Sequence, residues 1–204
     1  MQRNEIKFKI NNNNLMFFKN NSKIFNVYSQ RKIFSIYFDT FNLSDFVDSE
    51  EGTVPRKKIR LRYYGEIDNN LESSKILNGS IEIKKTFDTY REKKKFEICD
   101  TFKNSVEFVK NFSDKKRLPV CAISYDRNYY KYLNNVRITI DRNIKYYSLD
   151  KYLNLIFRNA EYENIVEMKI ENINEINSLE TDYLNAYRVR FSKYCEAIKK
   201  IKIY

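Results

Sequence analysis

The chain has 204 residues, of which 42% are hydrophobic and 32% charged, proportions typical of a folded globular protein. It contains no histidine, which excludes histidine metal ligands, histidine general bases and a Ser-His-Asp triad, and its three glycines exclude a glycine-rich phosphate loop. The formal net charge of +11 predicts an anionic partner or a strongly cationic surface.

The predicted strands share one pattern, in which charged and apolar residues alternate, as expected for strands with one polar and one buried face. In chain order they span residues 5–10, 32–40, 57–65, 80–85, 120–132, 136–142 and 165–171. Apolar residues at helical spacing predict helices over residues 15–25, 101–112, 176–187 and 192–201, with Thr101 and Ser192 as N-cap residues. Loops are predicted over residues 42–55 and 68–79, and a solvated basic loop over 115–117. A hairpin or crossover is predicted over residues 86–99, with solvated lysines at 93–95. The type of the segment over residues 147–157 is undecided.

Alternation along these strands separates the side chains into a polar set and an apolar set. The polar set comprises Glu5, Lys7, Lys9, Lys58, Arg60, Arg62, Glu82, Lys84, Tyr125, Arg127, Arg137, Thr139, Asp141, Glu167, Lys169 and Glu171. Three arrangements fit the pattern: an antiparallel sheet with a solvated charged face, a closed barrel whose charged face lines the interior, and a membrane barrel. The predicted helices, the cysteines and the lack of a recognisable signal peptide disfavour the membrane barrel.

The distribution of charge favours the barrel with a charged interior. Arginine and lysine dominate the middle strands, whereas glutamate recurs on the first, fourth and last, and a solvated face would more often mix the two signs along each strand. The frequent arginines suit bidentate phosphate binding, and the few carboxylates suit divalent cations. The sequence therefore predicts an α+β fold in a single domain over residues 1–204, with a closed antiparallel β-barrel of about eight strands and helices packed outside.

The cysteines indicate a reducing environment. Cys99, Cys121 and Cys195 are widely separated and form no CxxC pair, so we predict reduced, buried thiols in a cytoplasmic protein. No apolar run approaches the roughly 20 residues that a membrane-spanning helix needs.

Eight short motifs occur in the chain at residues 5–9 (EIKFK), 37–40 (YFDT), 59–65 (IRLRYYG), 81–84 (IEIK), 124–127 (SYDR), 136–141 (VRITID), 166–169 (VEMK) and 191–195 (FSKYC). In this order they resemble the VTC domain, the polyphosphate polymerase branch of the triphosphate tunnel metalloenzymes (the CYTH-like superfamily). The IRLRYYG strand is the most specific single element. The resemblance extends from residue 5 to about residue 200.

The resemblance implies an enzyme that moves the γ-phosphate of ATP onto a growing inorganic polyphosphate chain inside a basic tunnel, with Mn²⁺ or Mg²⁺ as cofactor. Such a transfer relies on positioning and charge neutralisation and needs no protein nucleophile. The residues implied to bind the reacting phosphates are Arg60, Arg62, Lys84, Arg127, Arg137 and Lys193. The further substrate-binding residues are Lys7, Lys9, Tyr125, Lys169 and Arg190, and the metal ligands are Glu167 and Glu82.

The chain departs from the family at Arg190, where a lysine is usual, and it contains no phosphoinositide-sensing module. The motifs do not separate polymerisation from hydrolysis, so a tripolyphosphatase or NTP phosphohydrolase in the same tunnel stays open. A non-catalytic module that binds polyphosphate, pyrophosphate or inositol phosphates stays open as well, and so does association with a membrane partner. A nucleic-acid partner is disfavoured, because carboxylates interleaved with the cations would repel a nucleic-acid backbone.

Overall fold

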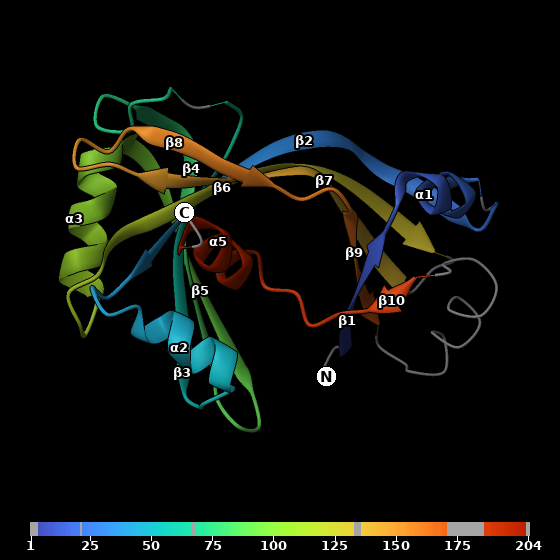
Figure 1. Cartoon of the computed structure of the whole chain (residues 1–204), viewed down its shortest axis with the longest axis horizontal. Helices are drawn as coiled ribbons and strands as arrows, with labels where there is room; N and C mark the ends of the chain where they lie inside the picture. The colour runs from blue at the N-terminus through green and yellow to red at the C-terminus, as the bar shows by residue number, and fades with distance from the viewer. Residues whose placement is uncertain (1–3, 21, 67, 133–135, 171–185, 203–204) are drawn as a thin grey trace. The chain divides into compact units, whose positions relative to one another are not determined.

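The computed structural model describes residues 4–20, 22–66, 68–132, 136–170 and 186–202. These residues belong to two compact units. Unit 1 comprises Met1–Lys32, Tyr125–Ile144 and Ala160–Phe191, and unit 2 comprises Ile33–Ser124, Lys145–Asn159 and Ser192–Tyr204. Three long strands, labelled in Figure 1, are β2 (Ile24–Asp39), β6 (Leu118–Tyr132) and β7 (Val136–Leu149). Each of them contributes residues to both units.

Unit 1 is a sheet with the strand order β10-β1-β9-β7-β6-β2. Its own elements are β1 (Asn4–Ile10), α1 (Asn12–Lys19), β9 (Asn164–Ile170) and β10 (Tyr187–Arg188). Strand β1 pairs antiparallel with β9 and β10, and β9 pairs antiparallel with β7. The apolar faces of these strands and Leu15 of α1 form one buried cluster, as the alternation predicts.

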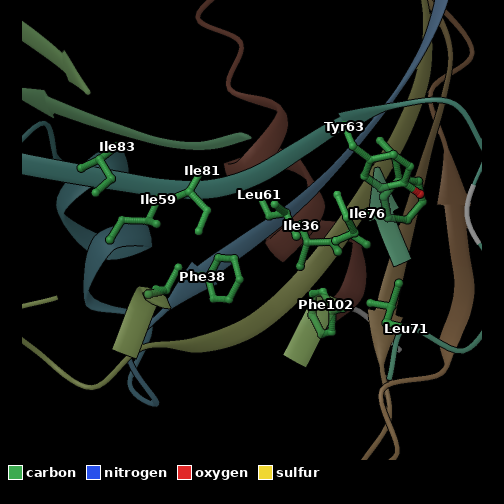
Figure 2. Close-up of a cluster of buried hydrophobic side chains, with 13 residues drawn as sticks. Ile36, Phe38, Ile59, Leu61, Tyr63, Leu71, Ile76, Ile81, Ile83 and Phe102 are labelled. Atoms are coloured by element: carbon green, nitrogen blue, oxygen red, sulfur yellow. The ribbon is translucent and has the colours of Figure 1, made fainter. Parts of the chain in front are cut away.

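Unit 2 continues the strand order from β2 through β3 and β4 to β5, and β8 pairs with β7. Its own elements are α2 (Ser44–Glu51), β3 (Arg56–Tyr64), β4 (Lys75–Thr86), β5 (Arg91–Thr101), α3 (Phe102–Phe112), β8 (Leu155–Ala160) and α5 (Lys193–Lys202). Ile59, Leu61 and Tyr63 of β3 are buried in one cluster with Phe102 and Val109 of α3 (Figure 2). The helix thus covers the apolar face of β3, which leaves Lys58, Arg60 and Arg62 on the other face.

The observed fold agrees with the prediction in class and in most elements. Each predicted strand coincides with an observed one, except that Glu171 lies outside the described residues. Thr101 caps α3 by accepting a hydrogen bond from the Asn104 backbone N–H at 3.2 Å, and Ser192 Oγ accepts one from the Cys195 N–H at 3.5 Å. The fold is a mainly antiparallel sheet with few helices. The strand order begins at β10 and ends at β5, and the described backbone pairings do not close it into a barrel.

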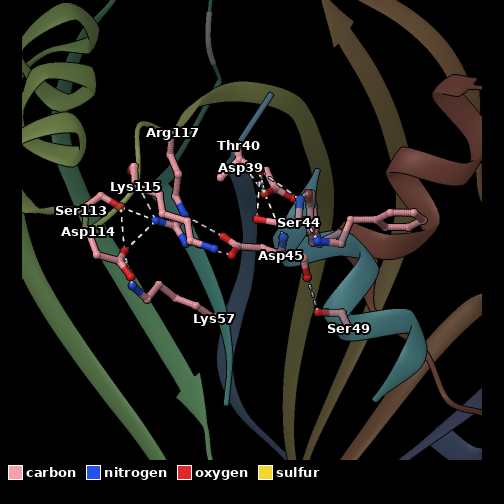
Figure 3. Close-up of polar contacts among 12 residues, drawn as sticks. Asp39, Thr40, Ser44, Asp45, Ser49, Lys57, Ser113, Asp114, Lys115 and Arg117 are labelled. Atoms are coloured by element: carbon pink, nitrogen blue, oxygen red, sulfur yellow. Dashed lines mark hydrogen bonds and ion pairs between the residues drawn. The ribbon is translucent and has the colours of Figure 1, made fainter. Parts of the chain in front are cut away.

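The prediction of a loop over residues 42–55 is wrong, because α2 lies inside it. The preceding strand supplies the cap: the carboxylate of Asp39 accepts hydrogen bonds from the backbone N–H groups of Asp45 and Phe46, each at 3.0 Å (Figure 3). A carboxylate at a helix N-terminus satisfies unpaired donors and complements the helix dipole. The helix ends before Gly52, whose φ of 81° lies in the left-handed region that glycine favours.

The basic loop over residues 115–117 is solvated only in part. Lys115 and Lys116 are exposed, but Arg117 is buried and its guanidinium makes a bidentate contact with Asp45, with Nε–Oδ2 at 2.8 Å and Nη2–Oδ1 at 2.9 Å (Figure 3). Arg117 Nη1 also donates to Asp114 at 2.9 Å. The prediction of a solvated Arg117 is therefore wrong, because its carboxylate partner lies on a helix that the sequence did not reveal.

Other predicted elements change in length or type. The helix predicted over residues 15–25 is α1, which begins and ends earlier, since β2 already starts at Ile24. The segment 147–157 contains the end of β7 and the start of β8 rather than a helix. The helix predicted over 176–187 lies outside the described residues up to residue 185, and Tyr187 belongs to β10. None of the helices in the described part of the chain is long and apolar enough to cross a bilayer.

Candidate functional site

The polar face of unit 2 is centred on Arg60 of β3. Arg60 lies opposite Tyr37 of β2 and opposite Glu82 of β4 in the strand register, so all three side chains share one face. Arg62, two residues further along, lies on the same face between Ser35 and Ser80. Only 13% of the Arg60 side chain and 12% of the Arg62 side chain are exposed. The alternation in the sequence therefore places two half-buried arginines side by side on one surface.

The carboxylate of Glu82 is the common partner of these cations. Its Oε2 accepts from Arg60 Nε at 2.9 Å and from Arg60 Nη2 at 2.6 Å. Its Oε1 accepts from Lys93 Nζ at 2.9 Å and from Arg62 Nη1 at 3.5 Å. Glu82 is buried, with 3% of its side chain exposed. Lys93 is exposed, as predicted, with 49% of its side chain accessible, and from β5 it reaches the Glu82 carboxylate.

The surroundings of Glu82 keep it ionised. Burial by itself would raise the pKa of this carboxyl group, but the charges of Arg60 and Arg62 and the hydrogen bonds from Arg60 and Lys93 outweigh it and hold the pKa well below its ordinary value. A buried carboxylate whose oxygens accept hydrogen bonds from cationic groups stabilises the fold only while the carboxylate stays charged.

We expect this group to make the fold sensitive to acid. A depressed pKa contributes stability that is fully present above the ordinary glutamate value of 4.5 and is lost as the pH falls toward the pKa of the folded state. The melting temperature of the wild type should therefore exceed that of Glu82→Gln at neutral pH, and the difference should shrink as the pH is lowered below 4.5. Thermal denaturation followed by circular dichroism across this range measures the difference. If the difference in melting temperature between the wild type and Glu82→Gln stays constant as the pH falls, the pKa of Glu82 is not depressed in the folded protein.

Helix α5 contacts the same face of unit 2. Lys58 Nζ donates to Ser192 Oγ at 3.0 Å, just before the helix begins. The ring of Tyr194 stacks on that of Tyr37 with centroids 5.1 Å apart, and its hydroxyl donates to the buried carboxylate of Asp39. Burial, followed by the neighbouring Asp39 carboxylate, raises the pKa of Tyr194, which keeps this donor protonated. Lys193 is the first residue of the helix and is half-buried.

Unit 1 has its own buried ion pair on its polar face. Arg127 of β6 binds Asp141 of β7 in a bidentate contact, with Nε–Oδ1 at 2.5 Å and Nη2–Oδ2 at 2.7 Å. Asp141 is completely buried, and the Arg127 guanidinium lies 5.3 Å from the ring centroid of the buried Tyr125. Burial would lower the pKa of Arg127, but Asp141 and Tyr125 raise it, so the guanidinium stays charged.

Strands β1 and β9 add a second group of charges to unit 1. Lys7 lies opposite Glu167, and Glu5 lies opposite Lys169 in the register. Lys7 Nζ lies 3.1 Å from Glu5 Oε1 and donates to the Phe191 carbonyl at 2.9 Å. Lys169 Nζ lies 3.3 Å from Glu167 Oε1. These predicted residues are therefore neighbours on one face.

The remaining predicted residues are more peripheral within their units. Lys9 pairs with Glu161 at 3.1 Å and lies 5.6 Å from the ring centroid of Phe191. Arg137 on β7 and Arg190 after β10 are exposed in unit 1, and Lys84 on β4 is exposed in unit 2. The structure groups Arg60, Arg62 and Glu82 in unit 2, and in unit 1 it groups Arg127 with Tyr125 and Lys7 with Glu167 and Lys169.

Several members of these clusters received no role from the sequence. Tyr37 accepts from Arg60 Nη1 at 3.0 Å, and Asp141 holds Arg127. Both belong to motifs that the sequence displays, YFDT and VRITID, but their partners lie on other strands. Nothing in the sequence indicates that Lys93 contacts Glu82, because this contact depends on the register of the β4–β5 hairpin.

Carboxylates suited to a divalent cation are few. Within the described ranges, no three His, Cys, Asp or Glu side chains gather into a metal-binding group. Mg²⁺ needs only one or two carboxylates when waters and substrate phosphates complete its shell. Glu167 fits that role, because Thr139 Oγ1 on the strand position opposite it is buried and has no hydrogen-bond partner among the described residues. Glu82 does not fit in this arrangement, because cations occupy its oxygens.

Solved structures with a similar fold come from distant organisms. The PH1819 protein from Pyrococcus horikoshii OT3 is 12% identical, with a TM-score of 0.59 and coverage of 98% of both chains. A candidate adenylyl cyclase from Hippeastrum with a dominant triphosphatase activity is also 12% identical, with a TM-score of 0.59 and coverage of 98% of this chain and 96% of that one. A candidate adenylate cyclase from Vibrio parahaemolyticus is 11% identical, with a TM-score of 0.56 and coverage of 97% of both.

At such low identities these structures show a shared fold. No curated protein matches the sequence. The sequence profile of the VTC domain, by contrast, matches residues 2–202, which is nearly the whole chain and both units. This match confirms the resemblance drawn from the eight motifs, and the chain belongs to the VTC domain family.

Proposed function

We propose that this protein is a polyphosphate polymerase, which transfers the γ-phosphate of ATP onto a growing inorganic polyphosphate chain inside a basic tunnel. The proposal rests on one observation above all: the half-buried pair Arg60 and Arg62 lies on one face of a strand whose sequence resembles the most specific motif of the family. Arginines held in low exposure bind phosphate oxygens more strongly than solvated ones. The profile match over both units supports a single VTC-like domain over residues 1–204.

The chemistry needs positioned cations and no nucleophile from the protein. Arg60, Arg62, Lys84 and Lys193 bind phosphates in unit 2, and Arg127 and Arg137 do so in unit 1, with Tyr125 donating to a phosphate oxygen. Lys7, Lys9, Lys169 and Arg190 hold the substrate chain in unit 1. Glu167 would hold Mg²⁺ or Mn²⁺, which supplies charge neutralisation at the transferred phosphoryl group when bound.

Hydrolysis of a triphosphate is the second candidate. It is favoured by the Hippeastrum protein, which shares the fold and has a dominant triphosphatase activity. The same cationic faces would stabilise attack by water as well as attack by a phosphate chain, so the two reactions differ in the acceptor.

Incubation with ATP and Mn²⁺ separates these functions, with long-chain polyphosphate detected on a gel and free phosphate in solution. We expect long chains from the wild type. Free phosphate without chains would make the protein a hydrolase. Neither product, together with measurable polyphosphate binding, would make it a non-catalytic binding module.

A further inference from the structure

The nitrogen atoms of the Arg60 guanidinium are already committed to protein acceptors. Nε and Nη2 donate to Glu82, and Nη1 donates to the hydroxyl of Tyr37 at 3.0 Å. Bidentate phosphate binding uses two adjacent donors of one guanidinium. A phosphate that binds Arg60 through its Nε and Nη2 edge must therefore displace Glu82.

Glu82 also occupies donors of the neighbouring cations. Lys93 Nζ donates to it at 2.9 Å, and Arg62 Nη1 lies at a longer 3.5 Å. One carboxylate thus lies among three cationic side chains with its own side chain only 3% exposed. This is the geometry in which a phosphate group would be bound, with a carboxylate in its place.

From these contacts we propose that Glu82 is an internal competitor of phosphate, and that it raises the phosphate concentration at which the polar face is occupied. The inference rests on the proposed function. A phosphate that binds the Nε and Nη2 edge of Arg60 must first release the Glu82 carboxylate, and that release subtracts from the binding free energy. A single phosphate has only these contacts to offset the loss. A chain of phosphates gains further contacts with other cations, so it occupies the site at concentrations at which orthophosphate does not.

The proposal makes an unusual prediction for Glu82→Gln. Removal of the carboxylate charge should tighten the binding of inorganic tripolyphosphate by about tenfold, because the charge-assisted hydrogen bonds no longer compete. Isothermal titration calorimetry with tripolyphosphate, and separately with orthophosphate, in EDTA at fixed ionic strength, measures the change. Orthophosphate should also bind more tightly to the variant, since it releases the same contacts.

Glu97→Gln is the matched control. Glu97 lies on β5 and pairs with Lys95 at 2.5 Å, but 74% of its side chain is exposed. The substitution removes the same charge without freeing the Arg60 cluster, so affinity should stay within about twofold of the wild type. An equal gain in both variants would show a net-charge effect and overturn the proposal.

Glu82→Asp is a second variant that tests the proposal if Glu82→Gln does not fold. It keeps the charge but is one methylene shorter, so it reaches its three partners less well and should give an affinity between those of the wild type and Glu82→Gln. Unchanged or weaker tripolyphosphate binding in folded Glu82 variants would overturn the proposal, even if the wild type makes polyphosphate. A wild type that neither binds tripolyphosphate nor turns over ATP would instead overturn the proposed function and the inference together.

Discussion

Arg62→Ala should reduce turnover of ATP by at least about a hundredfold while the protein stays folded. On the proposed function, Arg62 binds a phosphate of the reacting chain in a site where only 12% of its side chain is exposed. Loss of one positioned cationic donor removes transition-state stabilisation that water does not replace. The fold should survive, because Glu82 keeps its closer contacts with Arg60 and Lys93.

Initial rates of phosphate release and chain formation, together with the far-ultraviolet circular dichroism spectrum, check both halves of this prediction. Arg91→Ala provides the control: Arg91 is an exposed residue at the start of β5, so the variant loses the same charge away from the cluster. We expect near wild-type rates from it. Wild-type rates in Arg62→Ala would show that Arg62 does not bind the reacting phosphate chain.

Asp141→Ala should be the most destabilising single substitution that we consider, at about 3–5 kcal/mol. Asp141 is completely buried, and both of its oxygens bind the Arg127 guanidinium. The alanine variant leaves a charged arginine with only 13% of its side chain exposed and no counter-charge at that position. At the usual scaling for a chain of this size, the melting temperature should fall by about 10 °C.

Urea denaturation of the wild type and the variant measures this difference in the free energy of unfolding. Asp126→Ala is the control on the neighbouring strand position. Asp126 is half-buried and accepts one hydrogen bond from the exposed Asn143 at 2.8 Å, so its loss should cost less than about 1 kcal/mol. If Asp141→Ala lowers the free energy of unfolding no more than Asp126→Ala does, the buried Arg127 does not need Asp141 as its counter-charge.

The strands and their faces could be read from the sequence because period-2 alternation is a local signal. Ile59, Leu61 and Tyr63 alternate with Lys58, Arg60 and Arg62, and the structure buries the first set under α3. Helix α2 could not be read in this way. Its sequence is acidic and weakly amphipathic, and its cap is the carboxylate of Asp39, which belongs to the preceding strand and lies six residues before Asp45.

The residue types of the candidate site were also visible, but their partners were not. Glu82 and Glu167 look alike in the sequence, because each is a glutamate in an E-x-K strand. In the structure, Glu82 is held by Arg60 and Lys93, whereas Glu167 lies beside Lys169 and opposite a buried threonine hydroxyl. That difference is the reason why we propose Glu167, and not Glu82, as the metal ligand.

By itself the sequence determined the mainly antiparallel sheet, the polar and apolar faces of each strand, and the family to which the chain belongs. These properties follow from local periodicity and from the order of short motifs along the chain. Only the tertiary structure decided the charge partners: Arg117 with Asp45, Arg127 with Asp141, and Arg60 with Glu82. The reason is physical, because strand register and helix docking bring together side chains that lie between 14 and 72 positions apart, and ion pairs act through distance in space.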